Sequence, residues 1–186
     1  MMMSMATFYF IHELAEQCTF ARMAKIDLKK CRTTNNFGLN REYYYLQSLL
    51  IALGNISRIL WPIKKYENRR IELRTILEVK DDSILRNRDL RNLFEHFDER
   101  ADDWFAAEER RAFSDRNVGS KEGVATPSEK DRLRTFNPET WTLTCIGREF
   151  KLHPAIQAAY ELYEKIQEKT GQPGKKVKPL PGEFDE

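Results

Sequence analysis

The sequence predicts an all-α fold, a bundle of four to five helices with one small β-hairpin before the last helix. The main observation is that apolar residues recur at steps of three and four along most of the chain, which is the period of an amphipathic helix. The second is a short stretch around Gly147 in which apolar and polar residues alternate, as they do in paired strands. Because 186 residues are enough for one core, residues 5–170 are assigned to a single domain and residues 171–186 to a flexible tail.

Composition and charge narrow the function classes. Charged residues make up 32% of the chain, but the net charge is only +2, so any nucleic-acid footprint must be local. Cys18, Cys31 and Cys145 have no metal-ligand spacing, so we expect a reducing compartment and neither a metal nor another cofactor. The apolar start of the chain lacks the basic residues of a signal peptide, and no run is long enough to cross a membrane. The expectation is a cytoplasmic protein without membrane contact.

The first two helices are predicted over residues 5–31 and over the stretch that leads to Trp61. In the first helix the apolar positions are Ile11, Leu14, Cys18, Ala21 and Leu28. In the second they are Leu46, Leu49, Leu53, Ile56, Leu60 and Ile63. Pro62 lacks a backbone donor and clashes with the preceding turn, so the second helix is expected to end or kink near Trp61. A shorter helix is expected over 68–77.

A third long helix is expected to begin after Asp81-Asp82-Ser83, where two acids and a capping hydroxyl precede a periodic run, and to continue to about Arg116. Its apolar stripe consists of Leu90, Leu93, Phe94, Phe97, Ala101, Trp104 and Phe105. The segment 115–127 contains two glycines and a proline, and it is predicted to be a loop.

The hairpin is predicted over about 140–152. If Gly147-Arg148 forms a two-residue turn, Cys145 pairs with Phe150 and Leu143 pairs with Leu152. Pro154 then suits the first turn of the last helix, which is expected to stop at Gly171. The apolar register of that helix is Ala155, Ala159, Leu162 and Ile166.

The third helix carries the residues that point to a function. Arg91, Asn92 and His96 form the pattern Arg-Asn-x-x-x-His in its first half. This pattern resembles the signature of the HEPN superfamily, small helical proteins in which an arginine and a histidine separated by four to six residues mark the ribonuclease members. The resemblance implies a HEPN-like bundle, with Arg91, Asn92 and His96 as the candidate catalytic residues.

The reaction that the resemblance implies is metal-independent cleavage of RNA, in which the ribose 2′-hydroxyl attacks the adjacent phosphorus and leaves a 2′,3′-cyclic phosphate. A histidine can transfer the protons, and an arginine stabilises the charge that develops around phosphorus. The resemblance also implies a toxin or defence protein with an antitoxin or regulatory partner. Asp98 stands where the toxin branch paired with a nucleotidyltransferase carries a modified tyrosine, so neutralisation by that route is not expected.

Helix geometry predicts a homodimer through the motif-bearing helix. At about 100° per residue, Asn92 and His96 project roughly 40° apart, whereas Arg91 lies roughly 140° from His96. The reach of the arginine, or a second copy of the helix, must therefore bring a guanidinium and an imidazole to one phosphate. HEPN nucleases do this by dimerising. The arginines that flank the motif, Arg86, Arg88 and Arg100, are the candidate substrate-binding residues.

Two other interpretations of the sequence stay open. In one, the chain is a non-catalytic HEPN-like dimer that binds a nucleotide or a protein partner, with Arg91 and His96 in a structural network. In the other, it is a helical interaction module unrelated to HEPN, and Arg91 and Glu95 form a simple i,i+4 ion pair. A solvent-accessible cleft in which two copies of Arg91 and His96 converge would favour the nuclease.

Overall fold

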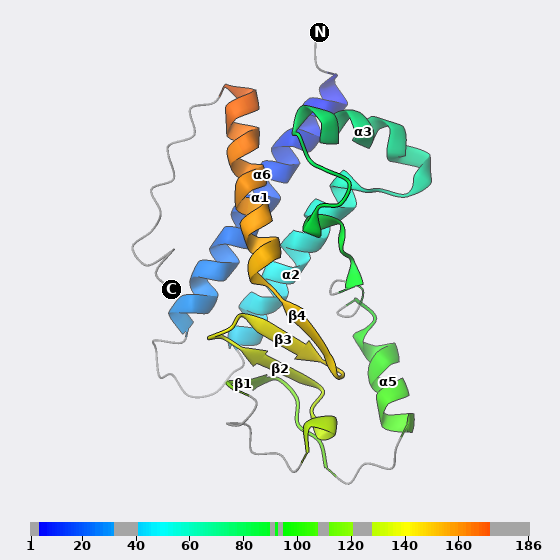
Figure 1. Cartoon of the computed structure of the whole chain (residues 1–186), viewed down its shortest axis with the longest axis vertical. Coiled ribbons are helices and arrows are strands. Elements are labelled where there is room, and N and C mark those ends of the chain that lie inside the picture. The colour runs from blue at the N-terminus through cyan, green and yellow to red at the C-terminus, as the bar shows by residue number, and fades with distance from the viewer. Residues whose placement is uncertain are drawn as a thin grey trace.

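The computed structural model describes residues 4–31, 41–89, 92, 95–107, 112–120 and 128–171. Three long helices, α1 (Met5–Cys31), α2 (Arg41–Leu60) and α6 (His153–Thr170), pack against one another. A four-stranded sheet lies at one end of these helices, and α3 (Glu67–Ile76) lies at the other (Figure 1). The predicted all-α fold is therefore wrong, because the chain combines a helical bundle with a mixed sheet.

The long helices follow the predicted pattern. α1 has the predicted bounds, and all five of its predicted core positions are at most 1% exposed. α2 ends at Leu60, just before Pro62, and α3 agrees with the predicted 68–77 to within one residue at each end. α6 carries Pro154 in its first turn and stops at Gly171, whose φ of 59° is the left-handed conformation that glycine favours. Ile63 departs from the prediction, since it follows the end of α2 and is 66% exposed.

The sheet contains two strands that the sequence pattern did not predict. Its strands are β1 (Asn117–Val118), β2 (Arg134–Asn137), β3 (Thr142–Cys145) and β4 (Arg148–Lys151), in that order across the sheet. β1 is parallel to β2, and the other neighbours are antiparallel. β1 lies within the segment 115–127, so the prediction of a loop is wrong at those two residues. Residues 121–127 of that segment lie outside the described residues.

The predicted hairpin exists, but its register differs from the prediction. Cys145 pairs with Arg148 and Leu143 pairs with Phe150, so the turn consists of Ile146 and Gly147. Both turn residues have positive φ, 49° and 72°, as a two-residue turn between twisted strands requires. The turn therefore begins one residue earlier than predicted, and every pair shifts by two positions.

The third long helix does not form as one continuous helix to Arg116. After Ser83, whose Oγ accepts a hydrogen bond from the amide of Leu85, the chain makes the 3₁₀ turn η2 (Ile84–Arg86). Residues 89, 92 and 95 are helical, and His96 lies in a turn directly before α5 (Phe97–Ala107). Two further 3₁₀ turns, η1 (Lys64–Tyr66) and η4 (Glu129–Asp131), precede α3 and β2 respectively.

The predicted apolar stripe of this segment is only partly buried. Trp104 is 8% exposed, and Phe97 and Ala101 are half-buried. Phe105 is 43% exposed, so its assignment to the buried stripe is wrong. The other members, Leu90, Leu93 and Phe94, lie outside the described residues.

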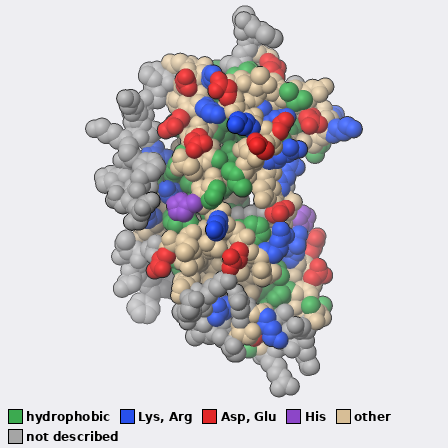
Figure 2. Space-filling model, in the orientation of Figure 1, with side chains coloured by type: hydrophobic (Ala, Val, Ile, Leu, Met, Phe, Trp, Pro, Cys, Tyr) green, Lys and Arg blue, Asp and Glu red, His purple; other side chains and the backbone are tan. Residues whose placement is uncertain are grey.

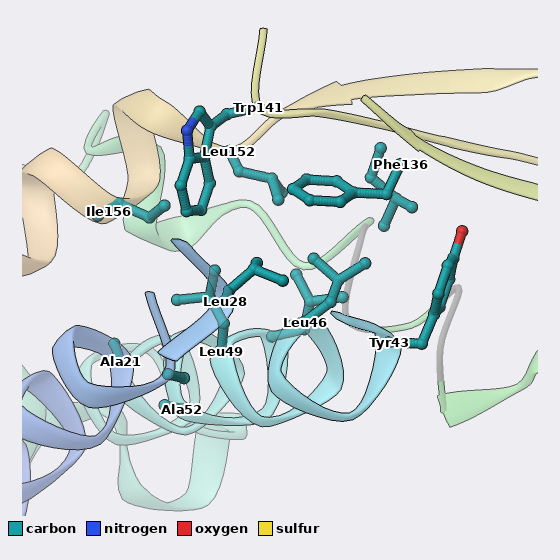
Figure 3. Close-up of a cluster of buried hydrophobic side chains, with 13 residues drawn as sticks. Ala21, Leu28, Tyr43, Leu46, Leu49, Ala52, Phe136, Trp141, Leu152 and Ile156 are labelled. Atoms are coloured by element: carbon teal, nitrogen blue, oxygen red, sulfur yellow. The ribbon is translucent and has the colours of Figure 1, made fainter. Parts of the chain in front are cut away.

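One core joins the sheet to the helices. Phe136 of β2 is fully buried against apolar side chains of α1 and α2 (Figure 3). Leu143 of β3 is fully buried in the same cluster. Trp141, just before β3, meets the ring of Phe136 edge-on at a centroid distance of 5.9 Å. Because the inner face of the sheet shares this core with the bundle, the sheet is fixed in position relative to α2.

Arg74 connects the end of α2 to the segment that follows α3. Its side chain is buried, and its Nη1 donates to the carbonyl of Leu60 at 2.6 Å. Its Nε lies 3.0 Å from Oδ1 of Asp81. The last carbonyls of a helix have no partner within the helix, so the arginine satisfies an acceptor that burial would otherwise leave without a donor.

Truncation of Phe136 to Ala is expected to lower the free energy of unfolding by about 3–5 kcal/mol, because it opens a cavity between the sheet and the helices. The matched control is Phe113→Ala, since the Phe113 ring is 58% exposed. We expect this control to cost less than about 1 kcal/mol. Urea unfolding followed by tryptophan fluorescence measures both values, and equal losses would show that Phe136 is not a core residue.

Candidate functional site

We call residues 88–100 the motif segment. Four of the predicted site residues follow one another along it. The amide of Asn92 donates to the carbonyl of Arg88 at 2.8 Å, the amide of His96 to Asn92 at 3.1 Å, and the amide of Arg100 to His96 at 3.2 Å. Each bond spans four residues, as in an α-helix, so each side chain lies one turn further along and about 40° round from the one before. We call these four residues, Arg88, Asn92, His96 and Arg100, the motif stripe.

His96 is accessible and has a carboxylate beside it. Its side chain is 55% exposed, and its Nδ1 lies 3.6 Å from Oε2 of Glu99. The other ring nitrogen, Nε2, is the candidate atom for proton transfer to or from a substrate. An accessible imidazole of this kind suits proton transfer near neutral pH.

The other predicted site residues are placed differently. Arg88 and Asn92 are half-buried, and Arg100 is exposed. Arg86 does not belong to the motif stripe, because its Nη1 donates to the backbone carbonyl of Asp81 at 3.1 Å. Arg91 lies outside the described residues, so its position relative to His96 stays a prediction.

Two arginines that the sequence did not single out contact the motif segment. Nη2 of Arg58, on α2, donates to Oε1 of Glu95 at 2.9 Å. Nη2 of Arg148, the first residue of β4, donates to Oδ2 of Asp89 at 3.1 Å. These contacts offset two acids of the motif segment, of which Glu95 directly precedes His96. The face of the molecule in Figure 2 shows the same mixture, with Lys and Arg side chains interleaved among Asp and Glu.

Arg134, on β2, holds the residue that follows His96. Its guanidinium carbon lies 3.8 Å from the centroid of the Phe97 ring. Its Nε donates to Oδ1 of Asp115 at 2.7 Å, and its Nη2 donates to the other oxygen of the same carboxylate. The ring of Tyr43 on α2 lies 5.8 Å from the guanidinium. One cation therefore contacts α2, the chain before β1 and the first residue of α5.

Asp115 stabilises the charge of this guanidinium. Burial opposes the charge of Arg134, but the hydrogen bonds and negative charge of Asp115 outweigh it, so the pKa of Arg134 lies above its ordinary value. The two side chains are only 14% and 17% exposed, and electrostatic attraction is stronger away from water. Neither residue has a fixed spacing from the motif, so no sequence signal identified the pair.

A cavity of about 270 Å³ lies between α2, η2, β4 and the start of α6. Its lining is mainly apolar and includes Leu50, Leu53, Phe150 and Leu152. Among the described residues that line the cavity, none belongs to the motif stripe. The candidate chemistry therefore lies on the surface rather than in this cavity.

The described parts of the chain contain no group of three or more His, Cys, Asp and Glu side chains arranged to hold a metal ion. Across the same residues, no helix has the length and apolar character needed to cross a bilayer. Comparisons of the sequence with protein-family models and with curated proteins, and of the structure with solved structures, found no match. The function must therefore be inferred from the geometry of the motif segment.

Diethyl pyrocarbonate is expected to modify His96 and His153 of the native protein before His12. The reagent attacks neutral, accessible imidazoles, and Nε2 of His12 is buried whereas His153 is exposed. Partial burial and the nearby Lys25 hold the pKa of His153 below its ordinary value, so a larger fraction of His153 than of a free imidazole is neutral and reactive at about pH 6.5. Peptide mass mapping gives the order of modification. Protection of His96 that is lost only on unfolding would contradict an accessible site.

Proposed function

We propose that the chain is a metal-independent endoribonuclease of the HEPN type that acts as a homodimer. The observation that carries this proposal is the motif stripe, in which an accessible His96 follows Asn92 by one turn and lies between Arg88 and Arg100. Arginine recognises phosphate well, and histidine transfers protons near neutral pH. A line of such groups suits the backbone of a phosphodiester strand.

In the proposed reaction, the 2′-hydroxyl oxygen of RNA forms a bond to the adjacent phosphorus as it loses its proton, and the bond between phosphorus and the 5′-oxygen breaks. His96 takes the proton from the nucleophile while water protonates the leaving oxygen, or water takes the first proton and His96 supplies the second. Arg91 is proposed to stabilise the negative charge that develops around phosphorus. Asn92 is proposed to orient the imidazole or to bond a phosphate oxygen. The products are a 2′,3′-cyclic phosphate and a 5′-hydroxyl.

The proposed dimer supplies an arginine from the second copy, because Arg91 and His96 are expected to lie roughly 140° apart on one helix. Two copies of the motif segment approach across a two-fold axis, so the same contacts are made twice. Each of the two sites then combines Arg91 of one copy with His96 of the other. This arrangement explains how one motif can provide both proton transfer and charge stabilisation.

His96→Ala is expected to reduce cleavage of RNA by more than about a hundredfold, because it removes the proton-transfer group. His153→Ala is the matched control: it removes another exposed histidine and is expected to retain wild-type activity. The assay uses end-labelled single-stranded RNA in excess EDTA, with products resolved on a denaturing gel and tested for cyclic phosphate ends. Circular dichroism checks that both variants fold.

Three results would each count against this mechanism. They are full cleavage by His96→Ala, a requirement for magnesium, and cleavage of a strand that carries 2′-deoxyribose at the scission position. The last of these substrates lacks the nucleophile. Any of the three would rule out attack by the 2′-hydroxyl with His96 as the proton-transfer group. A wild-type protein that does not cleave RNA would instead favour the non-catalytic dimer that binds a nucleotide or a protein partner.

Mixing two inactive variants tests the composite site. Arg91→Ala and His96→Ala homodimers are each expected to be inactive, but a mixed dimer keeps one complete site. After unfolding and refolding an equal mixture, about a quarter of wild-type activity is expected, since half of the dimers are mixed and each has one working site. Refolded single variants are the controls. If the mixture stays inactive although sedimentation shows mixed dimers, Arg91 and His96 act within one copy.

A further inference from the structure

Two carboxylates of the motif segment are paired with arginines from two other elements. Glu95 directly precedes His96 and contacts Arg58 of α2, whereas Asp89 lies at the start of the segment and contacts Arg148 of β4. Both arginines are therefore next to the motif stripe although they are distant from it in the sequence. Neither arginine was among the candidate substrate-binding residues that the sequence predicted.

These ion pairs are of the kind that a stronger anion can replace. The side chains of Arg58 and Glu95 are 57% and 43% exposed, and those of Arg148 and Asp89 are 51% and 57% exposed. Ion pairs in contact with water contribute little net free energy, because water solvates the separated charges nearly as favourably as they attract each other. Towards these carboxylates each arginine uses Nη2. A guanidinium has five N–H donors, and within the described part of the chain neither Nε nor Nη1 of these two arginines makes a hydrogen bond.

A phosphodiester matches what these arginines bind at present. It carries one negative charge, as a carboxylate does, and it accepts two parallel hydrogen bonds from one guanidinium. Replacing Glu95 or Asp89 by a phosphate keeps each arginine paired, and the side chain of the displaced carboxylate is already 43% or 57% exposed. The exchange therefore has a small cost, and each additional phosphate contact releases counterions from the strand.

We propose that Arg58 and Arg148 bind the phosphates of a single RNA strand that runs past His96, and that Glu95 and Asp89 occupy these arginines until the strand arrives. The inference deepens the proposed ribonuclease function and rests on it for the identity of the strand. Two kinds of residue then affect the same binding step in opposite directions. The arginines strengthen binding, and the carboxylates compete with the substrate.

The test measures binding separately from cleavage. All variants are made in the His96→Ala background, and fluorescence anisotropy follows the binding of a fluorescein-labelled single-stranded RNA over a range of salt concentrations. Arg58→Ala and Arg148→Ala are each expected to weaken binding roughly three- to tenfold at low salt and to lower the slope of log K against log salt by about 0.7. Glu95→Gln and Asp89→Asn are each expected to strengthen binding roughly two- to fivefold, because each releases a guanidinium.

A second surface ion pair provides the control for net charge. Lys169, near the end of α6, pairs with Glu78, which follows α3, at the end of the molecule away from the sheet (Figure 1). Lys169→Ala and Glu78→Gln change the charge by the same amounts as the test variants. Both are expected to leave the salt slope unchanged, since neither group lies near the motif stripe.

The outcomes separate this inference from the proposed function. Opposite shifts for the arginine and carboxylate variants, with unchanged controls, support the RNA contacts whether or not the wild type cleaves. Overturning results are weaker or unchanged binding in Glu95→Gln and Asp89→Asn, arginine variants that bind as the parent does, or no RNA binding at all. Cleavage by the wild type combined with any of these results would keep the nuclease and remove Arg58 and Arg148 from its substrate contacts.

Discussion

The guanidinium of Arg134 holds in place the part of the molecule that carries the candidate site. This guanidinium is largely buried, and a buried charge is tolerated only when an opposite charge and hydrogen bonds replace its lost hydration. Asp115 supplies both, and this pair holds the residues before β1 next to β2. Phe97 packs on the same guanidinium, which holds the start of α5 against the sheet. The place of His96 thus depends on a contact made by residues that follow it in the chain.

α1, α2 and α6 were predictable because each repeats its apolar pattern over many residues, whereas β1 and β2 were not predicted because they have only two and four residues. β2 buries Thr135 and Phe136, and two residues cannot define a period. Its place depends on a core shared with α1 and α2, which is a tertiary contact. The hairpin was predicted from its alternation, but its turn was misplaced. A β-branched residue such as Ile146 rarely adopts a positive φ, so Gly147-Arg148 was the natural assignment.

The site was predictable to the extent that it depends on spacing along one helix. Residues four apart follow one another on successive turns, so the relation of Asn92, His96 and Arg100 could be inferred without coordinates. Arg58, Arg134 and Arg148 reach this region from a helix and two strands, and only the folded chain shows that they do. Conversely, the charge of Arg86 and its position before the motif predicted a substrate contact, yet its guanidinium donates a hydrogen bond to the backbone carbonyl of Asp81.

The order of the strands also bears on how the protein behaves at high concentration. β4 is the last strand of the described sheet, and the backbone along such a margin can pair with another chain. Arg148, Glu149 and Lys151 fill three of its four positions, and all three are exposed. Charged side chains along a margin disfavour the stacking of strands from separate molecules, because their hydration would be lost without compensation. The same arginine that pairs with Asp89 thus helps to keep the sheet from growing into an aggregate.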